Sequence, residues 1–154
     1  VRSAEFIISV GYIRNPDLRI RLYDLVKQQG GQFSTLIAST AYVSQYASLD
    51  EGTVVMHHAF VNAEATVGKN VILNTFSNIE HGSIVGDQCH ISTGVMVNGD
   101  CKVGNNCFIG SGTVLYNGVT ITDGVIVSAG SVVRRSISIK GVYSGNPAGL
   151  KIRG

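Results

Sequence analysis

The sequence predicts an all-β protein dominated by a parallel β-helix, in which short strands stack as triangular coils. Three observations support this. From Val43 to Val127, the first residue of fifteen consecutive hexads is aliphatic, the fifth is small or β-branched, and the fourth is often Gly or Asn. A repeat this short cannot bury its own apolar residue and must stack on copies of itself. With three hexads per turn, fifteen hexads predict about five coils.

Each position of the hexad has a predicted place in the coil. The aliphatic residue fills the interior, the small residue points inward near a corner, and Gly or Asn tolerates the positive φ of a sharp turn. Cys89, Cys101 and Cys107 all occupy the small inward position, so we expect buried thiols. Their odd number fits a reducing compartment, and we expect a cytoplasmic protein.

Residues 1–42 lie outside the repeat and predict a β-α-β segment. Glu5–Gly11 is expected as a buried strand, Asn15 as the cap of a helix ended by Gly30, and Phe33–Ile37 as a second strand. An apolar stripe on the helix is expected from Leu18, Leu22, Leu25 and Val26. The segment is either part of a larger N-terminal α/β domain or a cap on the first coil. The start at Val1, without Met, favours a fragment.

We therefore divide the chain into 1–42, a β-helix over 43–133, and a C-terminal cap with a basic tail over 134–154. Gly145-Asn146-Pro147-Ala148 predicts a turn that covers the open end of the coil and protects its edge strands. Lys151 either belongs to a solvated tail or contacts the phosphates of a ligand.

Composition excludes several classes of protein. The net charge is +2 and only 14% of residues are charged, so the sequence lacks the excess of basic residues typical of proteins that bind nucleic acids or membrane surfaces. The sequence has no apolar run near 18 residues and no signal peptide.

His81 is the strongest catalytic candidate. It occupies an outward position of its hexad, and the residue one coil later is Gly99, which leaves a notch beside the imidazole. An imidazole titrates near neutral pH and can take a proton from an amine or hydroxyl. An N–H at the notch could hold a tetrahedral oxyanion. Asn74, Glu80 and His90 lie near His81 in sequence, whereas His57 and His58 are expected to be solvated or at an interface.

The chain resembles a known family at these residues. Asn74-Thr75-Phe76-Ser77-Asn78-Ile79-Glu80-His81, then Gln88-Cys89-His90-Ile91-Ser92, then Gly94 and Gly99, are similar to the sialic acid O-acetyltransferase (NeuD-like) group. This group includes bacterial N-acetyltransferases of nucleotide-linked amino-sugars. Tyr143-Ser144-Gly145-Asn146-Pro147-Ala148 is similar to its C-terminal motif. The resemblance, rather than the hexads, implies a left-handed β-helix.

The resemblance also implies a function. It implies a homotrimer with sites between subunits, acetyl-CoA as donor, a sugar acceptor and no metal. His81 would be the general base with Glu80 beside it, and Asn74 and His90 would bind substrate. The donor would contact the residues His90, Gly94, Gly99, Asn146, Pro147, Ala148 and Lys151.

The sequence departs from the family pattern at Gly82, where relatives usually carry a carboxylate directly after the base. Glu80 is the candidate to replace that orienting acid. We retain two alternatives to an acetyltransferase: a non-catalytic oligomeric module, and a zinc hydratase of the γ-carbonic anhydrase type. The hydratase would need three converging His ligands.

Overall fold

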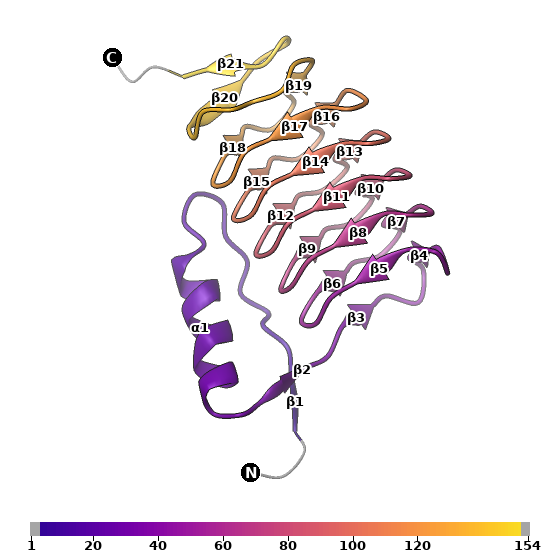
Figure 1. Ribbon diagram of the computed structural model, residues 1–154, viewed down its shortest axis with the longest axis vertical. Coiled ribbons are helices and arrows are strands. Elements are labelled where there is room, and N and C mark those ends of the chain that lie inside the picture. Colours follow the sequence, from indigo (N-terminus) through magenta and orange to yellow (C-terminus); the bar gives the residue numbers. More distant parts are fainter. Residues whose placement is uncertain (1–3, 152–154) are drawn as a thin grey trace.

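A computed structural model describes residues 4–151 and shows a left-handed parallel β-solenoid of about six turns (Figure 1). The predicted fold class is confirmed. The solenoid has one turn more than the hexads predict, because strands on both sides of the repeat join its sheets.

Three sheets form the faces of the solenoid, and almost every strand is two residues long. The eight-stranded sheet contains β3 (Leu36–Ile37), β6 (Val54–Val55), β9 (Ile72–Leu73), β12 (His90–Ile91), β15 (Phe108–Ile109), β18 (Ile126–Val127), β20 (Val142–Ser144) and β21 (Gly149–Leu150). The six-stranded sheet contains β4 (Tyr42–Val43), β7 (Phe60–Val61), β10 (Asn78–Ile79), β13 (Met96–Val97), β16 (Val114–Leu115) and β19 (Val132–Val133). The five-stranded sheet contains β5 (Ser48–Leu49), β8 (Thr66–Val67), β11 (Ile84–Val85), β14 (Lys102–Val103) and β17 (Thr120–Ile121).

The register places residues 18 apart directly above one another. Ile79 of β10 pairs with Val61 on one side and with Val97 on the other. In this column the second residue of each strand points inward, partly buried at Val43 in β4 and fully buried in the five strands that follow, so aliphatic side chains stack along the interior. Burying such a side chain contributes about 1.5–3 kcal/mol. The coil is therefore rigid enough to hold side chains on its outside at fixed spacings.

The corners of the coil use residues that accept a positive φ. Gly82 and Gly94 have φ values of +64° and +66°. Larger residues adopt the same conformation at some corners, including Phe76 with φ +59° and His58 with φ +58°. The rings of His58 and Phe76 stack with centroids 5.0 Å apart. This contact between two neighbouring coils offsets part of the cost of the positive φ at each residue.

The N-terminal segment forms the expected β-α-β order, but the strand predicted over Phe33–Ile37 is wrong as one element, because it splits into β2, which stays in a small sheet, and β3, which joins the solenoid. β1 (Glu5–Phe6) pairs in parallel with β2 (Gln32–Phe33), and α1 spans Asp17–Gln28. The N-cap position is Pro16 rather than the predicted Asn15, which lies one residue earlier and accepts a hydrogen bond of 2.8 Å from the Asp17 amide through its Oδ1. The expected buried strand to Gly11 is wrong, because the chain leaves the small sheet after Phe6 and runs along the solenoid (Figure 1).

The apolar stripe predicted for α1 is wrong at two of its four positions. Leu18 and Leu25 are more than half exposed, whereas Arg19 and Tyr23 are buried. Tyr23 stacks on Phe33 with ring centroids 4.6 Å apart. The helix turns this mixed face inward because the Arg19 guanidinium finds backbone carbonyl acceptors there. Leu22 and Val26 are partly buried against the same small cluster.

The C-terminal end closes the coil with an antiparallel hairpin. β20 continues the parallel ladder onto β18, and β21 folds back antiparallel on β20. Asn146 and Pro147 lie in the turn between these strands, and the Ala148 amide donates to the Val132 carbonyl at 2.8 Å. The turn therefore covers the last coil. The predicted basic tail is described only to Lys151, and its remaining residues lie outside the described range.

The three cysteines are free and fully buried in the solenoid interior, as predicted. None of the helices within residues 4–151 is long and apolar enough to cross a membrane.

Candidate active site

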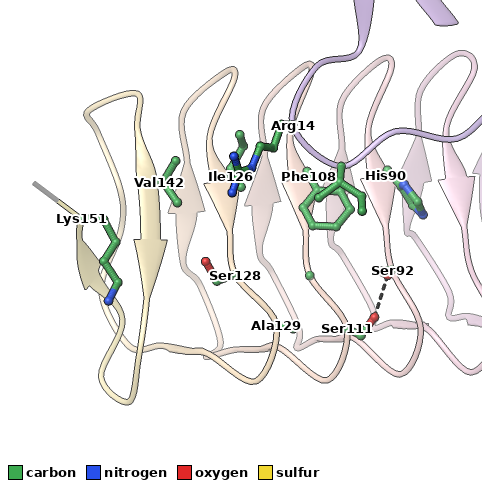
Figure 2. Close-up of a pocket in the computed structure, with 12 residues that line it drawn as sticks. Arg14, His90, Ser92, Phe108, Ser111, Ile126, Ser128, Ala129, Val142 and Lys151 are labelled. Atoms are coloured by element: carbon green, nitrogen blue, oxygen red, sulfur yellow. Dashed lines mark hydrogen bonds between the residues drawn. The ribbon is translucent and has the colours of Figure 1, made fainter. Parts of the chain in front are cut away.

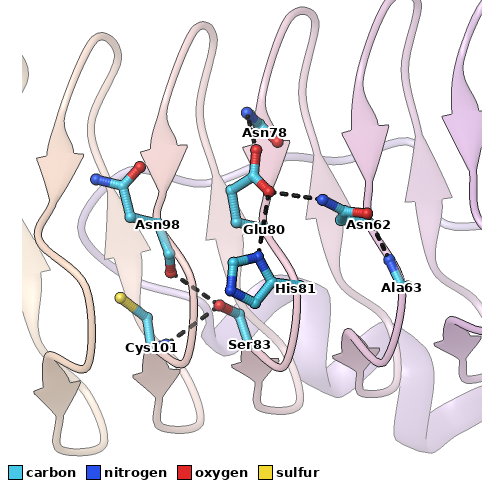
Figure 3. A network of polar contacts seen from close by, with 8 residues as sticks. All are labelled: Asn62, Ala63, Asn78, Glu80, His81, Ser83, Asn98 and Cys101. Carbon is cyan, nitrogen blue, oxygen red and sulfur yellow. Dashed lines mark hydrogen bonds and ion pairs between the residues drawn. The ribbon is translucent and has the colours of Figure 1, made fainter.

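His81 lies at the corner between β10 and β11, with its ring turned toward Glu80 (Figure 3). Its Nδ1 is 3.7 Å from Glu80 Oε2, and its side chain is 61% exposed. A carboxylate at Nδ1 favours the tautomer that leaves Nε2 free to accept a proton, and it stabilises the charged imidazolium. The geometry brings together the two residues that the sequence predicts as a base and its neighbouring acid.

Two amides fix Glu80 in the ionised form. Asn62 Nδ2 donates to Glu80 Oε2 at 2.7 Å and Asn78 Nδ2 donates to Oε1 at 3.0 Å (Figure 3). The hydrogen bond from Asn62 is the largest of the effects that hold the pKa of Glu80 below its usual range. Glu80 therefore stays negative at neutral pH and faces His81 as a carboxylate.

Gly82 has φ +64° and stands in the corner column that holds Glu64 one coil before and Asp100 one coil after, both also at positive φ. A Cβ at Gly82 would lie 2.5 Å from Asp100 Oδ1, so the Asp100 carboxylate would have to move to admit a side chain there. In this chain the acid that faces the imidazole instead precedes His81 in the sequence.

Gly99 lies next to the His81 ring, one coil later, and its lack of a side chain leaves a notch there. A Cβ at Gly99 would lie 2.6 Å from His81 Nε2 and 2.7 Å from its Cε1. On the other side of the notch, Asn117 Nδ2 lies 3.3 Å from the same point. The notch is thus the side-chain-free surface of Gly99, which the His81 ring and the Asn117 amide flank, and a side chain at residue 99 would displace the imidazole.

His90 has different surroundings. It is the outward residue of β12 and lies edge-on to the rings of Tyr12 and Phe108. Its Nδ1 is 2.7 Å from the Tyr12 carbonyl oxygen, and its Nε2 is 3.5 Å from Asn74 Nδ2. Burial is the main cause that lowers the pKa of His90, so the ring is neutral at neutral pH.

A groove of about 740 Å³ runs along the outside of the eight-stranded sheet (Figure 2). Its walls combine apolar side chains with three serines, and Ser92 Oγ lies 2.8 Å from Ser111 Oγ. Arg14 and Lys151 add two cations, and neither has an acidic partner within residues 4–151. His90 lies at one end of this lining, so the groove connects it with Lys151.

A second pocket of about 340 Å³ lies on the other side of His90. It is bounded by the N-terminal segment and by the outward residues of β3, β6 and β9, and is mostly apolar. Asn74 and His90 supply polar groups to its wall. His90 thus separates two cavities.

The predicted site residues fall into four places. His81, Glu80 and Gly99 meet at one corner, and His90 meets Asn74 on the eight-stranded sheet and Lys151 along the groove. Asn146, Pro147 and Ala148 form the terminal cap, and Gly94 lies at another corner; none of these four lines the groove. The described residues do not gather three His, Cys, Asp or Glu side chains as a metal site needs, so the hydratase interpretation gains no support here.

The sequence did not point to Arg14, Tyr12 or Asn117. Arg14 and Tyr12 stand in an irregular segment whose path across the coil no periodicity predicts. Asn117 could have been found by adding a further 18 residues to Gly99, since the register stacks these positions.

The comparisons with known proteins agree with this architecture. Residues 100–135 match the family described as bacterial transferase hexapeptide, six repeats. The chain belongs to the hexapeptide transferases. The acetyltransferase domain of PglB from Neisseria gonorrhoeae FA1090 is 28% identical, with a TM-score of 0.89 over 96% of this chain and 70% of that chain.

A second solved structure is that of PerB from Caulobacter crescentus in complex with CoA and GDP-perosamine. It is 32% identical to this hexapeptide transferase, with a TM-score of 0.87, over 90% of this chain and 67% of that chain. The PglB domain has also been solved in complex with acetyl coenzyme A. The narrower resemblance to sialic acid O-acetyltransferases stays a prediction.

Proposed function

We propose that this hexapeptide transferase moves an acetyl group from acetyl-CoA to an amine or hydroxyl of a nucleotide-linked sugar. One observation carries the proposal: His81 Nε2 stands beside the side-chain-free Gly99 of the next coil, and His81 Nδ1 faces the Glu80 carboxylate. The similarity to proteins solved with acetyl-CoA, or with CoA and GDP-perosamine, supports the donor and the class of acceptor.

The proposed chemistry is direct transfer. The acceptor nitrogen or oxygen attacks the thioester carbonyl carbon while His81 Nε2 takes its proton. The new C–N or C–O bond forms as the C–S bond breaks, and the proton passes from His81 to the departing CoA thiolate. The Glu80 carboxylate stabilises the imidazolium between the two proton transfers. No protein nucleophile takes part, because none of the described serines and cysteines beside His81 is both exposed and paired with it.

The groove fits the donor by its chemistry. Pantetheine is an apolar arm with amide groups, and the groove offers apolar walls with serine hydroxyls. Arg14 and Lys151 would pair with the phosphates, where each cation gains a charge-assisted hydrogen bond. Lys151 would thus bind acetyl-CoA, as the sequence leads us to expect, and Arg14 would bind its phosphates as well.

One chain does not bring the base and the groove together. His81 stands at the corner between the six-stranded and five-stranded sheets, whereas the groove lies on the eight-stranded sheet. The six-stranded sheet lies between them along the coil. A complete site therefore requires the His81 corner of one chain beside the groove of another.

The outer surface of the six-stranded sheet supports this pairing. Its outward column is almost wholly apolar, from Tyr42 and Phe60 through Met96 to Val114 and Val132. The matching column of the five-stranded sheet is mostly polar: Ser48, Thr66, Ile84, Lys102 and Thr120. Three copies that direct their six-stranded sheets toward a threefold axis would bury the apolar column and align each His81 corner with a neighbour's groove.

The experiment measures acetyl-CoA binding by calorimetry and oligomer mass on one sample, followed by turnover with GDP-perosamine as the acceptor probe. We expect a trimer that binds about one acetyl-CoA per subunit and releases CoA only when an amino-sugar nucleotide is present. An intact trimer without acetyl-CoA binding would contradict the proposal and favour a structural module. Turnover with hydroxyl sugars but not with amino-sugars would assign O-acetylation.

A further inference from the structure

The N-terminal segment is attached to the solenoid by two buried side chains. The Arg19 guanidinium is 1% exposed and donates to the Ile8 carbonyl at 2.6 Å, the Val10 carbonyl at 2.9 Å and the Asn70 carbonyl at 3.2 Å. It therefore joins two points of the segment to one point of the coil.

Tyr12 makes the second attachment. Its hydroxyl lies 2.5 Å from the Gln88 carbonyl oxygen and 3.0 Å from the Cys107 carbonyl oxygen, on two successive coils. The ring is 9% exposed and packs against His90 and Phe108. The backbone of Tyr12 is thus fixed above β12.

This position decides which nitrogen of His90 carries the proton. A backbone carbonyl only accepts hydrogen bonds, so His90 Nδ1, at 2.7 Å from the Tyr12 oxygen, must be the donor. In the neutral ring the lone pair then lies on Nε2. Asn74 Oδ1 accepts from the Thr75 amide at 2.8 Å, which turns its Nδ2 toward His90 Nε2 at the long distance of 3.5 Å.

We infer that Tyr12 and Arg19 are positioning residues of the transfer site: they place the Tyr12 carbonyl on His90 Nδ1, so that Nε2 accepts a hydrogen bond from a ligand. This inference rests on the proposed function for the identity of the ligand. The ligand group must be an N–H or O–H, because Nε2 offers a lone pair and no proton. His90 borders both cavities, so the donor group comes either from the amides of acetyl-CoA in the groove or from a hydroxyl of the sugar in the second pocket.

The test uses the full chain with 15N-labelled histidine rings and reads the tautomer of His90 by long-range NMR, which requires no substrate. We expect the wild-type ring to carry its proton on Nδ1. Tyr12→Phe keeps the ring but removes its two hydrogen bonds, and Arg19→Met keeps the length of the side chain but removes three. Both should shift His90 toward a mixture of tautomers. Tyr46→Phe and Arg21→Met, at exposed positions, are the matched controls and should leave the signal unchanged.

Steady-state kinetics show whether the N–H or O–H group that donates to His90 Nε2 belongs to acetyl-CoA or to the sugar. With acetyl-CoA and GDP-perosamine as probes, Tyr12→Phe should raise one KM by about two- to tenfold, the effect of one hydrogen bond. A raised KM for acetyl-CoA assigns the group to the donor, and a raised KM for the sugar assigns it to the acceptor. Thermal melting shows whether each variant retains the coil.

Two results would overturn the inference. One is a wild-type His90 protonated on Nε2. The other is an unchanged tautomer with unchanged KM values in folded Tyr12→Phe and Arg19→Met proteins. Because the NMR signal does not depend on turnover, an inactive wild-type protein would contradict the proposed function and leave this test intact.

Discussion

Two histidines nine residues apart along the solenoid have opposite surroundings. His81 is 61% exposed, faces the Glu80 carboxylate through Nδ1 and borders an open notch through Nε2. His90 is largely covered by Tyr12 and Phe108 and faces a carbonyl through Nδ1. A carboxylate can stabilise an imidazolium, whereas a carbonyl in a buried site favours the neutral ring. On this difference rests our proposal that His81 transfers the proton and that His90 accepts a hydrogen bond.

Replacing His81 should have the largest effect. His81→Ala removes the base and should lower kcat by about 10²- to 10⁴-fold, while acetyl-CoA binding stays within a few fold. Steady-state kinetics and calorimetry measure the two quantities. If His81→Ala retained a near-normal kcat, the exposed histidine of the pair would have no part in the transfer.

The notch gives the second prediction. Gly99→Ala puts a Cβ 2.6 Å from the position of His81 Nε2, so the imidazole must move or the ligand must. A displacement near 1 Å can cost about a hundredfold in rate, and we expect a loss of that order in kcat/KM. Gly30→Asn is the control, because its Cβ meets nothing within 4 Å and Asn tolerates its φ of +75°. Equal rates for both variants would show that the notch is not where the ligand binds.

Glu80→Gln tests the carboxylate that distinguishes the surroundings of His81 from those of His90. The amide keeps the shape of the side chain but cannot stabilise an imidazolium, so kcat should fall by about tenfold or more. The lowered pKa of Glu80 also predicts a change in acid stability. The carboxylate stabilises the fold above its ordinary pKa of 4.5, and this contribution is lost as pH falls through the lower folded value. Thermal melting should therefore be less acid-sensitive in Glu80→Gln, and an unchanged pH dependence would argue against the network around Glu80.

The smallest effect concerns His90. Its pKa is lowered from 6.5, so below that pH the unfolded chain binds a proton that the folded chain does not, and stability falls as pH decreases. One such group changes the free energy of unfolding by at most about 1.4 kcal/mol per pH unit. His90→Gln should remove this slope, measured by melting between pH 7 and pH 5, whereas His58→Gln at an exposed corner should keep it. A wild-type slope in His90→Gln would mean that His90 is not held neutral.

The solenoid and the His81 corner could be predicted from the sequence for the same reason. A strict period of six fixes both the inward column and the 18-residue stacking, and residue numbers alone therefore place Gly99 against His81. The N-terminal segment could not be predicted in this way. Arg19 and Tyr12 find partners in backbone carbonyls 51 to 95 residues away, and carbonyls leave no mark in a sequence.

The helix shows the same limit. Leu18 and Leu25 stand at helical spacing and predict a buried stripe, but the helix turns Arg19 inward, where three carbonyls accept hydrogen bonds from its Nε and Nη1. The sequence makes Glu80 the candidate for the acid missing at Gly82, although adjacent side chains on a strand usually point apart. The corner after β10 lets His81 turn back toward Glu80, which strand alternation alone does not reveal.

The central claim is that the site combines the His81 corner of one chain with the groove of another, and subunit mixing tests it most directly. Two variants are made: His81→Ala, which lacks the base, and Ala129→Trp, which fills the groove. Each alone should be inactive. Co-assembly in equal amounts should restore about a quarter of wild-type activity, because in a random trimer about one site in four pairs an intact corner with an intact groove. Mixed assemblies as inactive as either variant alone would contradict the account and place the whole site within one chain.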